Sequence, residues 1–393
     1  MKVRVLHLIT RLDLGGAQQN TLACVERHDR ERFEVALLAG SGGELDDQAL
    51  AIPDARVDLV PWLRHPIAPL HDLAAVPRLA LTLRRLRVDV VHTHSSKAGI
   101  LGRVGAWLAG VPCIVHTVHG WSFNDEQSLA ARSLYVALER LAARLTDRLL
   151  VVSESDRRRG TTLRIGKPDR YRVVRSGIDA SLYRAPSRPR ELVRRELGFG
   201  PDDVVVGTLA CLKPQKAPLD FVEAARLARA RDPRLRFFIA GDGPERKAVE
   251  ARIAAAGLPD HVKLLGWRRD AADLLHAMDL FLLTSRFEGL PRAVLQAMAA
   301  GVAVIATEVD GIPEVVREGE TGVLVPPARP EIAARRVVEL GADPVLRARL
   351  AACARARLGA EYDLARMVRQ LEREYLDLVS LRASRAHARS LAS

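Results

Sequence analysis

Short runs of apolar residues alternate along this chain with longer segments in which apolar side chains recur at helical spacing. Seven such runs precede a stretch rich in proline and glycine at residues 179–201, and six more follow it. Nearly continuous strands of Val, Leu and Ile, joined by amphipathic helices, are typical of parallel sheets covered on both faces. The pattern therefore predicts the α/β class, with two doubly wound, Rossmann-like parallel-sheet domains.

The predicted strands divide the chain into domains. They lie at residues 3–9, 34–39, 57–60, 88–92, 113–118, 148–152 and 171–174, and then at 204–209, 236–240, 262–265, 280–284, 302–306 and 322–325. We expect an N-terminal domain at residues 1–180, a linker at 181–202 and a C-terminal domain at 203–355. A C-terminal helix at 356–381 and a polar, basic tail at 382–393 complete the expected organisation.

Composition agrees with two domains and narrows the partners. A chain of 393 residues, 48% of them hydrophobic, exceeds what one compact core usually holds. The net charge of +12 favours polyanionic partners, either nucleic acid or an anionic membrane surface. Aromatic residues make up only 4% and no nucleic-acid-binding motif occurs, so we expect no nucleic acid partner.

Cysteine spacing and hydropathy bear on the compartment. The four cysteines lie far apart without a CxxC pair, which argues against a metal knuckle or disulfide framework and for a reducing cytoplasm. The apolar run at residues 3–9 ends in a charged, glycine-containing loop, as expected for a strand rather than a signal peptide. No uninterrupted apolar segment reaches about 18 residues, so we expect a cytoplasmic protein without a membrane span.

The segment TSRFEGLPRAVLQAMAAGVAVIAT, residues 284–307, carries the strongest chemical signal, because it predicts a charged loop, a helix and a buried strand. Gly289 and Leu290 stand where the chain turns into the helix, so their backbone amides are candidates to bind a phosphate. Glu288 beside them is an acceptor suited to a neutral, hydroxyl-rich group such as a sugar. A nucleotide sugar fits both halves of this pattern.

Seven motifs follow one another in a fixed order: LITRLDLGGAQ at 8–18, HTHSSKAG at 92–99, HTVHGWSF at 116–123, SGID at 176–179, LKPQKAPLDF at 212–221, AGDGP at 240–244, and the segment around Glu288. Together they resemble glycosyltransferase family 4, whose members are retaining enzymes of the GT-B fold. The resemblance covers nearly the whole chain. It implies two domains facing a cleft, with the acceptor on the N-terminal side, the nucleotide sugar on the C-terminal side, and the C-terminal helix packed back on the N-terminal domain.

The same resemblance implies an activity. A family member transfers a sugar from a nucleotide-sugar donor, here expected to be a UDP-sugar, to a glycan or polyprenyl-linked acceptor in polysaccharide biosynthesis. It needs no cofactor. We expect no metal either, because no Asp-x-Asp pair occurs and His92 with His94 lacks a third ligand.

The resemblance also assigns roles to single residues. The catalytic residues are His119, Lys216 and Glu288, the donor-binding residues are Gly15, Gly16, Trp267, Gly289, Leu290 and Gln296, and the acceptor-side residues are Ser95, Ser96 and Lys97. Lys216 would neutralise the diphosphate as the anomeric bond breaks. His116 lies within the predicted strand that His119 ends, and the resemblance leaves it structural.

Two positions depart from the family pattern. Cys211 stands where the family usually has an Arg, five residues before Lys216, and Gln296 replaces the second Glu. A thiol supplies no fixed positive charge, whereas a Gln carbonyl still accepts a hydrogen bond from a ribose. These departures leave open a weakly active or inactive GT-B protein that binds nucleotide sugars. A GT-B enzyme of different reaction type, a nucleotide-sugar 2-epimerase, is a second alternative.

The segment LALTLRRLR, residues 79–87, combines apolar and cationic side chains on a predicted helix of the first domain. An amphipathic basic helix can bind an anionic bilayer, which would make the protein peripheral on the inner face of the membrane. A solvated, Arg-rich face explains the same residues equally well.

Overall fold

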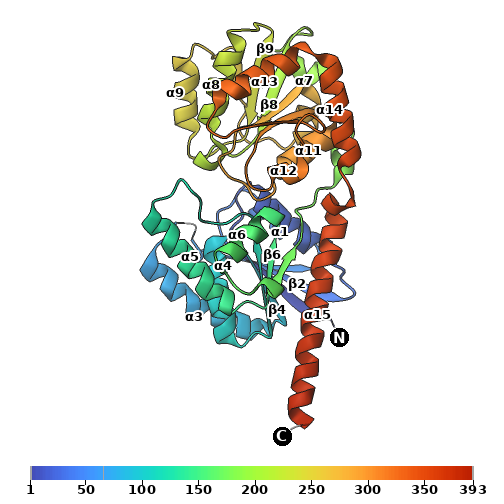
Figure 1. Cartoon of the computed structure of the whole chain (residues 1–393). Coiled ribbons are helices and arrows are strands. Elements are labelled where there is room, and N and C mark those ends of the chain that lie inside the picture. Colours follow the sequence, from blue (N-terminus) through green and yellow to red (C-terminus); the bar gives the residue numbers. More distant parts are fainter. Residues whose placement is uncertain (1, 65, 392–393) are drawn as a thin grey trace. The chain divides into compact units, whose positions relative to one another are not determined.

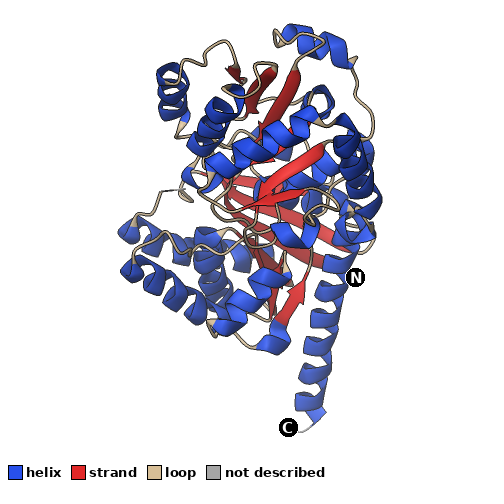
Figure 2. Ribbon diagram, turned by 45° about the horizontal axis from the view of Figure 1, so that its top comes forward, coloured by secondary structure: helices blue, strands red, loops and turns tan. Residues whose placement is uncertain are grey.

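The computed structural model describes residues 2–64 and 66–391, which form two compact units (Figure 1). Unit 1 combines the chain up to Gly177 with the part from Leu364 onward, and unit 2 spans Ile178–Asp363. Each unit is built on one parallel sheet with helices on its faces, which confirms the predicted α/β class (Figure 2).

A seven-stranded sheet forms the centre of unit 1, in the order β3-β2-β1-β4-β5-β6-β7. Its strands are β1 (Val3–Arg11), β2 (Phe33–Gly40), β3 (Ala55–Val60), β4 (Val90–His94), β5 (Cys113–Val118), β6 (Arg148–Val151) and β7 (Tyr171–Val173). Its helices are α1 (Gly16–Arg27), α2 (Asp46–Leu50), α3 (Pro69–Leu86), α4 (Ser96–Ala109), α5 (Leu129–Arg144), α6 (Glu154–Thr162), η1 (Pro168–Arg170) and α15 (Leu364–Leu391). From β1 the strand order runs outward to β2 and β3, and from its neighbour β4 it runs outward in the opposite direction to β5, β6 and β7.

Successive side chains of β1 point to opposite faces of this sheet, and they pack into two hydrophobic cores, one on each face. Val5 and Ile9 pack with α1 and with the buried side of α15, including Leu371. Leu6 and Leu8 pack on the opposite face with α3 and α4. The C-terminal helix is therefore part of the unit 1 core, as the family resemblance implied.

Unit 2 contains a six-stranded sheet in the order β10-β9-β8-β11-β12-β13. Its strands are β8 (Val204–Leu209), β9 (Leu235–Ala240), β10 (Val262–Leu264), β11 (Leu280–Leu283), β12 (Ala303–Thr307) and β13 (Val323–Val325). Its helices are η2 (Ala180–Tyr183), α7 (Arg190–Glu196), η3 (Pro214–Lys216), α8 (Pro218–Arg229), α9 (Arg246–Ala255), α10 (Ala271–Ala277), α11 (Arg292–Ala300), α12 (Ile312–Val315), α13 (Pro330–Ala342), α14 (Pro344–Arg357) and η4 (Ala360–Tyr362). Within the described residues, every strand that the apolar runs predicted is present.

The boundaries between the parts differ from those expected. Residues 181–202, predicted as a linker, belong to unit 2, because arginines of α7 hold them there: Arg190 and Arg194 pair with Asp279 at 2.7 and 2.5 Å. The C-terminal helix begins at Leu364 rather than 356 and continues to Leu391, through most of the expected tail. This stretch is rich in Ala, Arg and Leu, which favour helix. Residues 392–393 of the expected tail lie outside the described residues.

Candidate active site

In unit 2 the predicted donor-site residues gather at the carboxyl ends of two neighbouring strands, β8 and β11. From β8 the chain continues outward to β9 and β10, and from β11 it continues in the opposite direction to β12 and β13. Such a switch point is where doubly wound sheets bind ligands. Lys216 ends η3 after β8, and Glu288 lies in the loop after β11.

Hydrogen bonds tie these two loops together. The Thr284 hydroxyl donates to the carbonyl oxygens of Lys216 and Ala217, each at 3.1 Å. The backbone amide of Arg286 donates to the Gln215 carbonyl oxygen at 2.8 Å. The position of Lys216 relative to the β11 loop is therefore fixed by the backbone as well as by its own side chain.

Lys216 and Glu288 form an ion pair through Nζ and Oε1. Ser285 Oγ donates to the same carboxylate oxygen at 2.6 Å, and the Glu288 amide donates to Asp310 Oδ2 at 2.7 Å. The Glu288 side chain is only 5% exposed and that of Lys216 is 19% exposed. The two predicted catalytic residues of unit 2 thus contact each other in a largely buried setting.

The other predicted donor residues of unit 2 lie on adjoining loops and on α11. Gly289 and Leu290 are buried just before Pro291, after which α11 begins. On α11, Nε2 of Gln296 donates to the Tyr183 hydroxyl at 2.8 Å. Trp267 is half-buried in the loop after β10.

Cys211 lies half-buried in the loop after β8, which packs closely against the loop after β9. A Cβ at Gly241 would come within 1.9 Å of the Ala210 carbonyl oxygen, so this approach requires glycine. Arg286 is a basic residue that could stand in for the missing family Arg. Its guanidinium pairs with Asp220 at 2.8 Å, so its charge is already balanced there.

In unit 1 the predicted glycines and serines lie at the other switch point, between β1 and β4. Gly15 and Gly16 stand at the start of α1, after the short loop that follows β1. Ser95 and Ser96 stand at the start of α4, after β4, and Ser95 adopts a φ of 60°. The Ser95 hydroxyl is 2.8 Å from Thr10 Oγ1, which links the two strand ends.

Lys97, predicted on the acceptor side, is turned toward α3. Its Nζ pairs with Asp72 at 2.5 Å, and its side chain is 13% exposed. The charge of this lysine is therefore balanced within unit 1.

His119 follows β5 and begins a chain of hydrogen-bonded imidazoles. Its Nε2 is 3.1 Å from Nδ1 of His94, whose Nε2 is 3.0 Å from Nδ1 of His7. Nε2 of His7 is 3.0 Å from Nε2 of His28, and Nδ1 of His28 is 3.1 Å from Oε1 of Glu372 on α15. His119 is partly exposed, whereas the other members of the chain are buried.

Burial lowers the pKa of His7, His92 and His94 well below the usual value, and neighbouring imidazoles lower it further. The expectation that His92 and His94 lack a third partner was wrong, because His7 of β1 brings its ring nitrogens within 4.8 Å of theirs, as three ligands of a metal ion would lie. Each of the six nitrogens is already hydrogen-bonded, those of His92 to Tyr375 at 2.5 Å and Thr117 at 2.6 Å. We therefore interpret the group as a hydrogen-bonded cluster rather than a metal site.

His116, interpreted as structural from the sequence, lies inside β5. It is buried, and its Nδ1 is 2.9 Å from Thr93 Oγ1. A Cβ at Gly99 would lie 2.5 Å from its ring, so the neighbouring helix also encloses it.

Sequence reasoning missed several residues that hold the predicted ones. Ser285 and Asp310 fix Glu288, Tyr183 holds Gln296, and Glu372 ends the imidazole chain. Ser285 lies within the motif and could have been included. Tyr183 and Glu372 have no local signal, because they are 113 and 344 residues away from their partners.

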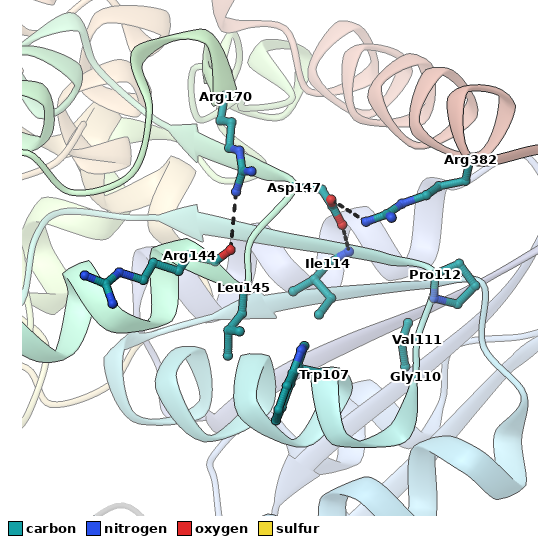
Figure 3. Close-up of a pocket in the computed structure, with 10 residues that line it drawn as sticks. All are labelled: Trp107, Gly110, Val111, Pro112, Ile114, Arg144, Leu145, Asp147, Arg170 and Arg382. Carbon is teal, nitrogen blue, oxygen red and sulfur yellow. Dashed lines mark hydrogen bonds and ion pairs between the residues drawn. The ribbon is translucent and has the colours of Figure 1, made fainter. Parts of the chain in front are cut away.

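A cavity of about 510 Å³ lies at the opposite, amino-terminal edge of the unit 1 sheet (Figure 3). Its lining includes Pro112, Asp147 and Arg170, which are the residues directly before β5, β6 and β7. Asp147 accepts from the Ile114 amide at 2.9 Å and pairs with Arg382 at 2.7 Å. None of the predicted site residues lines this cavity, so it is separate from the candidate active site.

Two doubly wound units, each with polar residues at its switch point, define the GT-B class of glycosyltransferases. Solved structures agree with this class. HepE of Anabaena, determined with UDP and glucose, is 23% identical and superposes with a TM-score of 0.81 over 95% of this chain and 100% of that one. WaaG, a glycosyltransferase of lipopolysaccharide biosynthesis, is 17% identical with a TM-score of 0.74 over 93% of this chain and 98% of its own.

The chain belongs to the group 1 glycosyl transferases, which confirms its resemblance to the retaining glycosyltransferases of family 4. The model of that group matches residues 189–357, and the glycosyl transferase 4-like domain matches residues 15–177. The UDP-Gal:alpha-D-GlcNAc-diphosphoundecaprenol alpha-1,3-galactosyltransferase of Escherichia coli is 31% identical over 382 residues, covering 96% of this chain and 98% of that enzyme. The putative glycosyltransferase EpsD of Bacillus subtilis (strain 168) is 29% identical over 73% of this chain and 76% of its own length.

Proposed function

We propose that this glycosyltransferase moves a hexose from a UDP-sugar to a saccharide carried on a polyprenyl diphosphate, with retention of the anomeric configuration. The observation that carries the proposal is the end-to-end similarity to the Escherichia coli enzyme, whose donor is UDP-galactose and whose acceptor is a diphosphoundecaprenol-linked sugar. Galactose is therefore the first sugar to test.

The Lys216–Glu288 pair supports this reaction in unit 2. When the acceptor hydroxyl oxygen bonds to the anomeric carbon, the bond from that carbon to the diphosphate breaks and negative charge develops on the diphosphate. We assign the stabilisation of this charge to Lys216 and to the backbone amides of Gly289 and Leu290. Attack from the same face lets the departing diphosphate take the acceptor proton, so no protein nucleophile is needed.

The sugar and the nucleotide need separate contacts. We assign Glu288 to a hydroxyl of the donor sugar, because its carboxylate is acceptor-only and held in place by Ser285. Gln296 and Trp267 would contact the nucleoside. In unit 1 we assign His119 to a sugar hydroxyl, Gly15 and Gly16 to close backbone approach of the substrates, and the Ser95 to Lys97 turn to the acceptor.

A membrane-facing surface on unit 1 would suit a lipid-linked acceptor at the cytoplasmic face of a membrane. Large apolar side chains are strongly exposed on neighbouring helices: Leu70 (86%) and Leu73 (71%) on α3, Trp107 (58%) on α4, and Leu129 (80%) and Leu134 (60%) on α5. Exposed arginines of α3 and α5 supply charge for anionic headgroups. This arrangement supports peripheral association.

The segment at residues 79–87 contributes fewer apolar side chains to that surface than the sequence suggested. Leu79 and Leu83 are buried in the core of unit 1, so they do not face a bilayer. Its exposed members are Leu81 and the arginines, including Arg84 and Arg85. Across the described residues, no helix is both long and apolar enough to cross a membrane.

A transfer assay tests the proposal. The protein is incubated with a short-chain polyprenyl diphosphate carrying N-acetylglucosamine and, in turn, with UDP-galactose, UDP-glucose and their N-acetylated forms. We expect one UDP-sugar to give an extended lipid whose new linkage is cleaved by an α-glycosidase. Binding of UDP-sugars without any transfer or hydrolysis would instead support the inactive binding protein, and conversion of the donor sugar without an acceptor would support the epimerase.

A further inference from the structure

The chain of imidazoles that begins at His119 ends at a carboxylate on the C-terminal helix. We propose that Glu372 sets the tautomer of His119 through the three rings between them, so that neutral His119 carries its proton on Nε2 and is basic at Nδ1. Glu372 is then a positioning residue for the active site, acting through four hydrogen bonds. The meaning of this tautomer for catalysis rests on the proposed role of His119, but its existence does not.

Proton counting along the chain carries the proposal. A neutral imidazole has one N–H and one acceptor nitrogen, so a ring that accepts on one side must donate on the other. The Glu372 carboxylate only accepts, which places the His28 proton on Nδ1 and leaves His28 Nε2 as an acceptor. His7 must then donate from Nε2 and accept at Nδ1.

The same proton count fixes the tautomers of the last two rings, His94 and His119. His94 donates from Nε2 to His7 and therefore accepts at Nδ1, whose hydrogen-bond partner is Nε2 of His119. His119 donates this hydrogen bond, and its second nitrogen, Nδ1, is unprotonated in the neutral ring. Reversing the direction at His119 would require reversing it at every ring and protonating Glu372.

The surroundings keep the rings neutral and the carboxylate ionised. Burial lowers the pKa of His7, His28 and His94, and the nearby Arg30 lowers that of His7 and His28 further. The hydrogen bond and charge of Glu372 act in the opposite direction on His28, but its pKa stays lowered overall. Burial alone would raise the pKa of Glu372, but hydrogen bonds from His28 and the Asp29 amide lower it overall.

The other titratable groups around the imidazoles form hydrogen bonds or ion pairs of their own. On the same strands, His92 bonds to Tyr375 and Thr117, and His116 bonds to Thr93. Burial raises the pKa of the Tyr375 hydroxyl well above its usual value, so this group stays protonated, and Cys24 and Glu372 add to that shift. Arg103, which lowers the pKa of His116, pairs with Glu139 at 2.7 Å.

This direction determines the hydrogen-bonding character of Nδ1 of His119. An unprotonated Nδ1 can only accept a hydrogen bond, whereas the opposite tautomer would donate one. The C-terminal helix, which lies far away in the sequence, would thereby select between two kinds of contact at the strand end.

Nitrogen-15 NMR of the full-length, histidine-labelled protein near pH 7.5 tests the proposal without substrate. Protonated and unprotonated imidazole nitrogens resonate at well-separated shifts, and single His→Gln variants assign the rings. We expect Nδ1–H at His28 and Nε2–H at His7, His94 and His119. An Nδ1–H tautomer at His119 in the unaltered protein would overturn the proposal, as would bound zinc in the protein as purified.

Substitutions at Glu372 test its control of the chain. Glu372→Leu removes the acceptor, so His119 should shift from a single tautomer to a mixture with a substantial Nδ1–H fraction. Glu372→Gln retains an acceptor oxygen and should preserve the original tautomer. Glu374→Leu is the matched control, because Glu374 lies on the same helix and pairs with Arg148 at 3.1 Å, outside the chain. An unchanged His119 tautomer in folded Glu372→Leu would refute the role of Glu372.

Discussion

Lowering the pH from about 7.5 to about 5.5 should destabilise unit 1 selectively, because burial strongly lowers the pKa of four of its histidines. Burial lowers the pKa of His7, His92, His94 and His116 well below the value of about 6.5 that they have in the unfolded chain. The unfolded state therefore binds more protons than the folded state once the pH falls below that value. Stability is fully present above about pH 6.5 and is lost as the pH decreases.

The size of the loss follows from the proton linkage. A ring that stays neutral in the folded state but titrates with a pKa of about 6.5 when unfolded contributes about 1.4 kcal/mol between these two pH values. Four such rings together contribute about 5 kcal/mol, a large part of the stability of a typical domain. The Glu372 carboxylate, whose pKa is lowered overall, adds a loss in the same direction only at more acidic pH.

Hydrogen exchange followed by mass spectrometry, corrected for the intrinsic pH dependence of exchange, resolves the two units. We expect the opening free energy of the slowest β1 and β4 amides to fall by several kcal/mol, while amides of β8 and β11 change little. His92→Gln should reduce the loss by about 1.4 kcal/mol, and His276→Gln in unit 2 is its control. A constant opening free energy for unit 1 across this range would show that the rings are not held neutral.

Three further predictions concern activity and membrane binding. Lys216→Ala should lower the transfer rate by roughly 10²-fold and cost about 3 kcal/mol of stability, because it leaves the buried Glu288 carboxylate unpaired; adding Glu288→Gln should restore stability but not activity, and wild-type rates would contradict the assignment. Cys211→Arg should raise turnover by up to roughly 10²-fold with the best donor, and an unchanged or lower rate would show that no cation is missing at that position. Leu70→Ser with Leu73→Ser should weaken co-sedimentation with anionic vesicles, and so should high salt, whereas Leu182→Ser on unit 2 should not; equal binding to neutral vesicles would refute the charge contribution.

The sheets were predictable because a buried parallel strand leaves a continuous apolar run in the sequence, wherever it lies in the sheet. The boundaries between the two units were harder to predict. The glycines and prolines of residues 181–202 indicated a linker, but the ion pairs from Arg190 and Arg194 to Asp279 join this stretch to unit 2. Their partner lies more than eighty residues away, beyond the reach of any local pattern.

The candidate site was predictable where a motif carries it and unpredictable where a tertiary contact completes it. The Glu288 segment and the Lys216 loop indicated the donor site, yet neither showed that the two side chains pair. The histidines of β4 alternate as strand residues do, but only the fold aligns them with His7, His28 and Glu372. Residues 79–87 read as amphipathic in the sequence, although packing against α4 buries Leu79 and Leu83.

On the proposed assignment, Lys216 contacts the leaving diphosphate and Glu288 contacts the donor sugar, and the two side chains form an ion pair with each other. An ammonium has three N–H donors, so Lys216 can bond to Glu288 and still donate to diphosphate oxygens. The described contacts of the Glu288 carboxylate involve Oε1, which leaves Oε2 to accept from a sugar hydroxyl. Glu288 therefore positions Lys216 but also offsets part of its charge, at a site where Cys211 already replaces the family's second cation. On the proposed assignment, we therefore expect the backbone amides of Gly289 and Leu290 to carry a larger share of leaving-group stabilisation here than in relatives that retain the Arg.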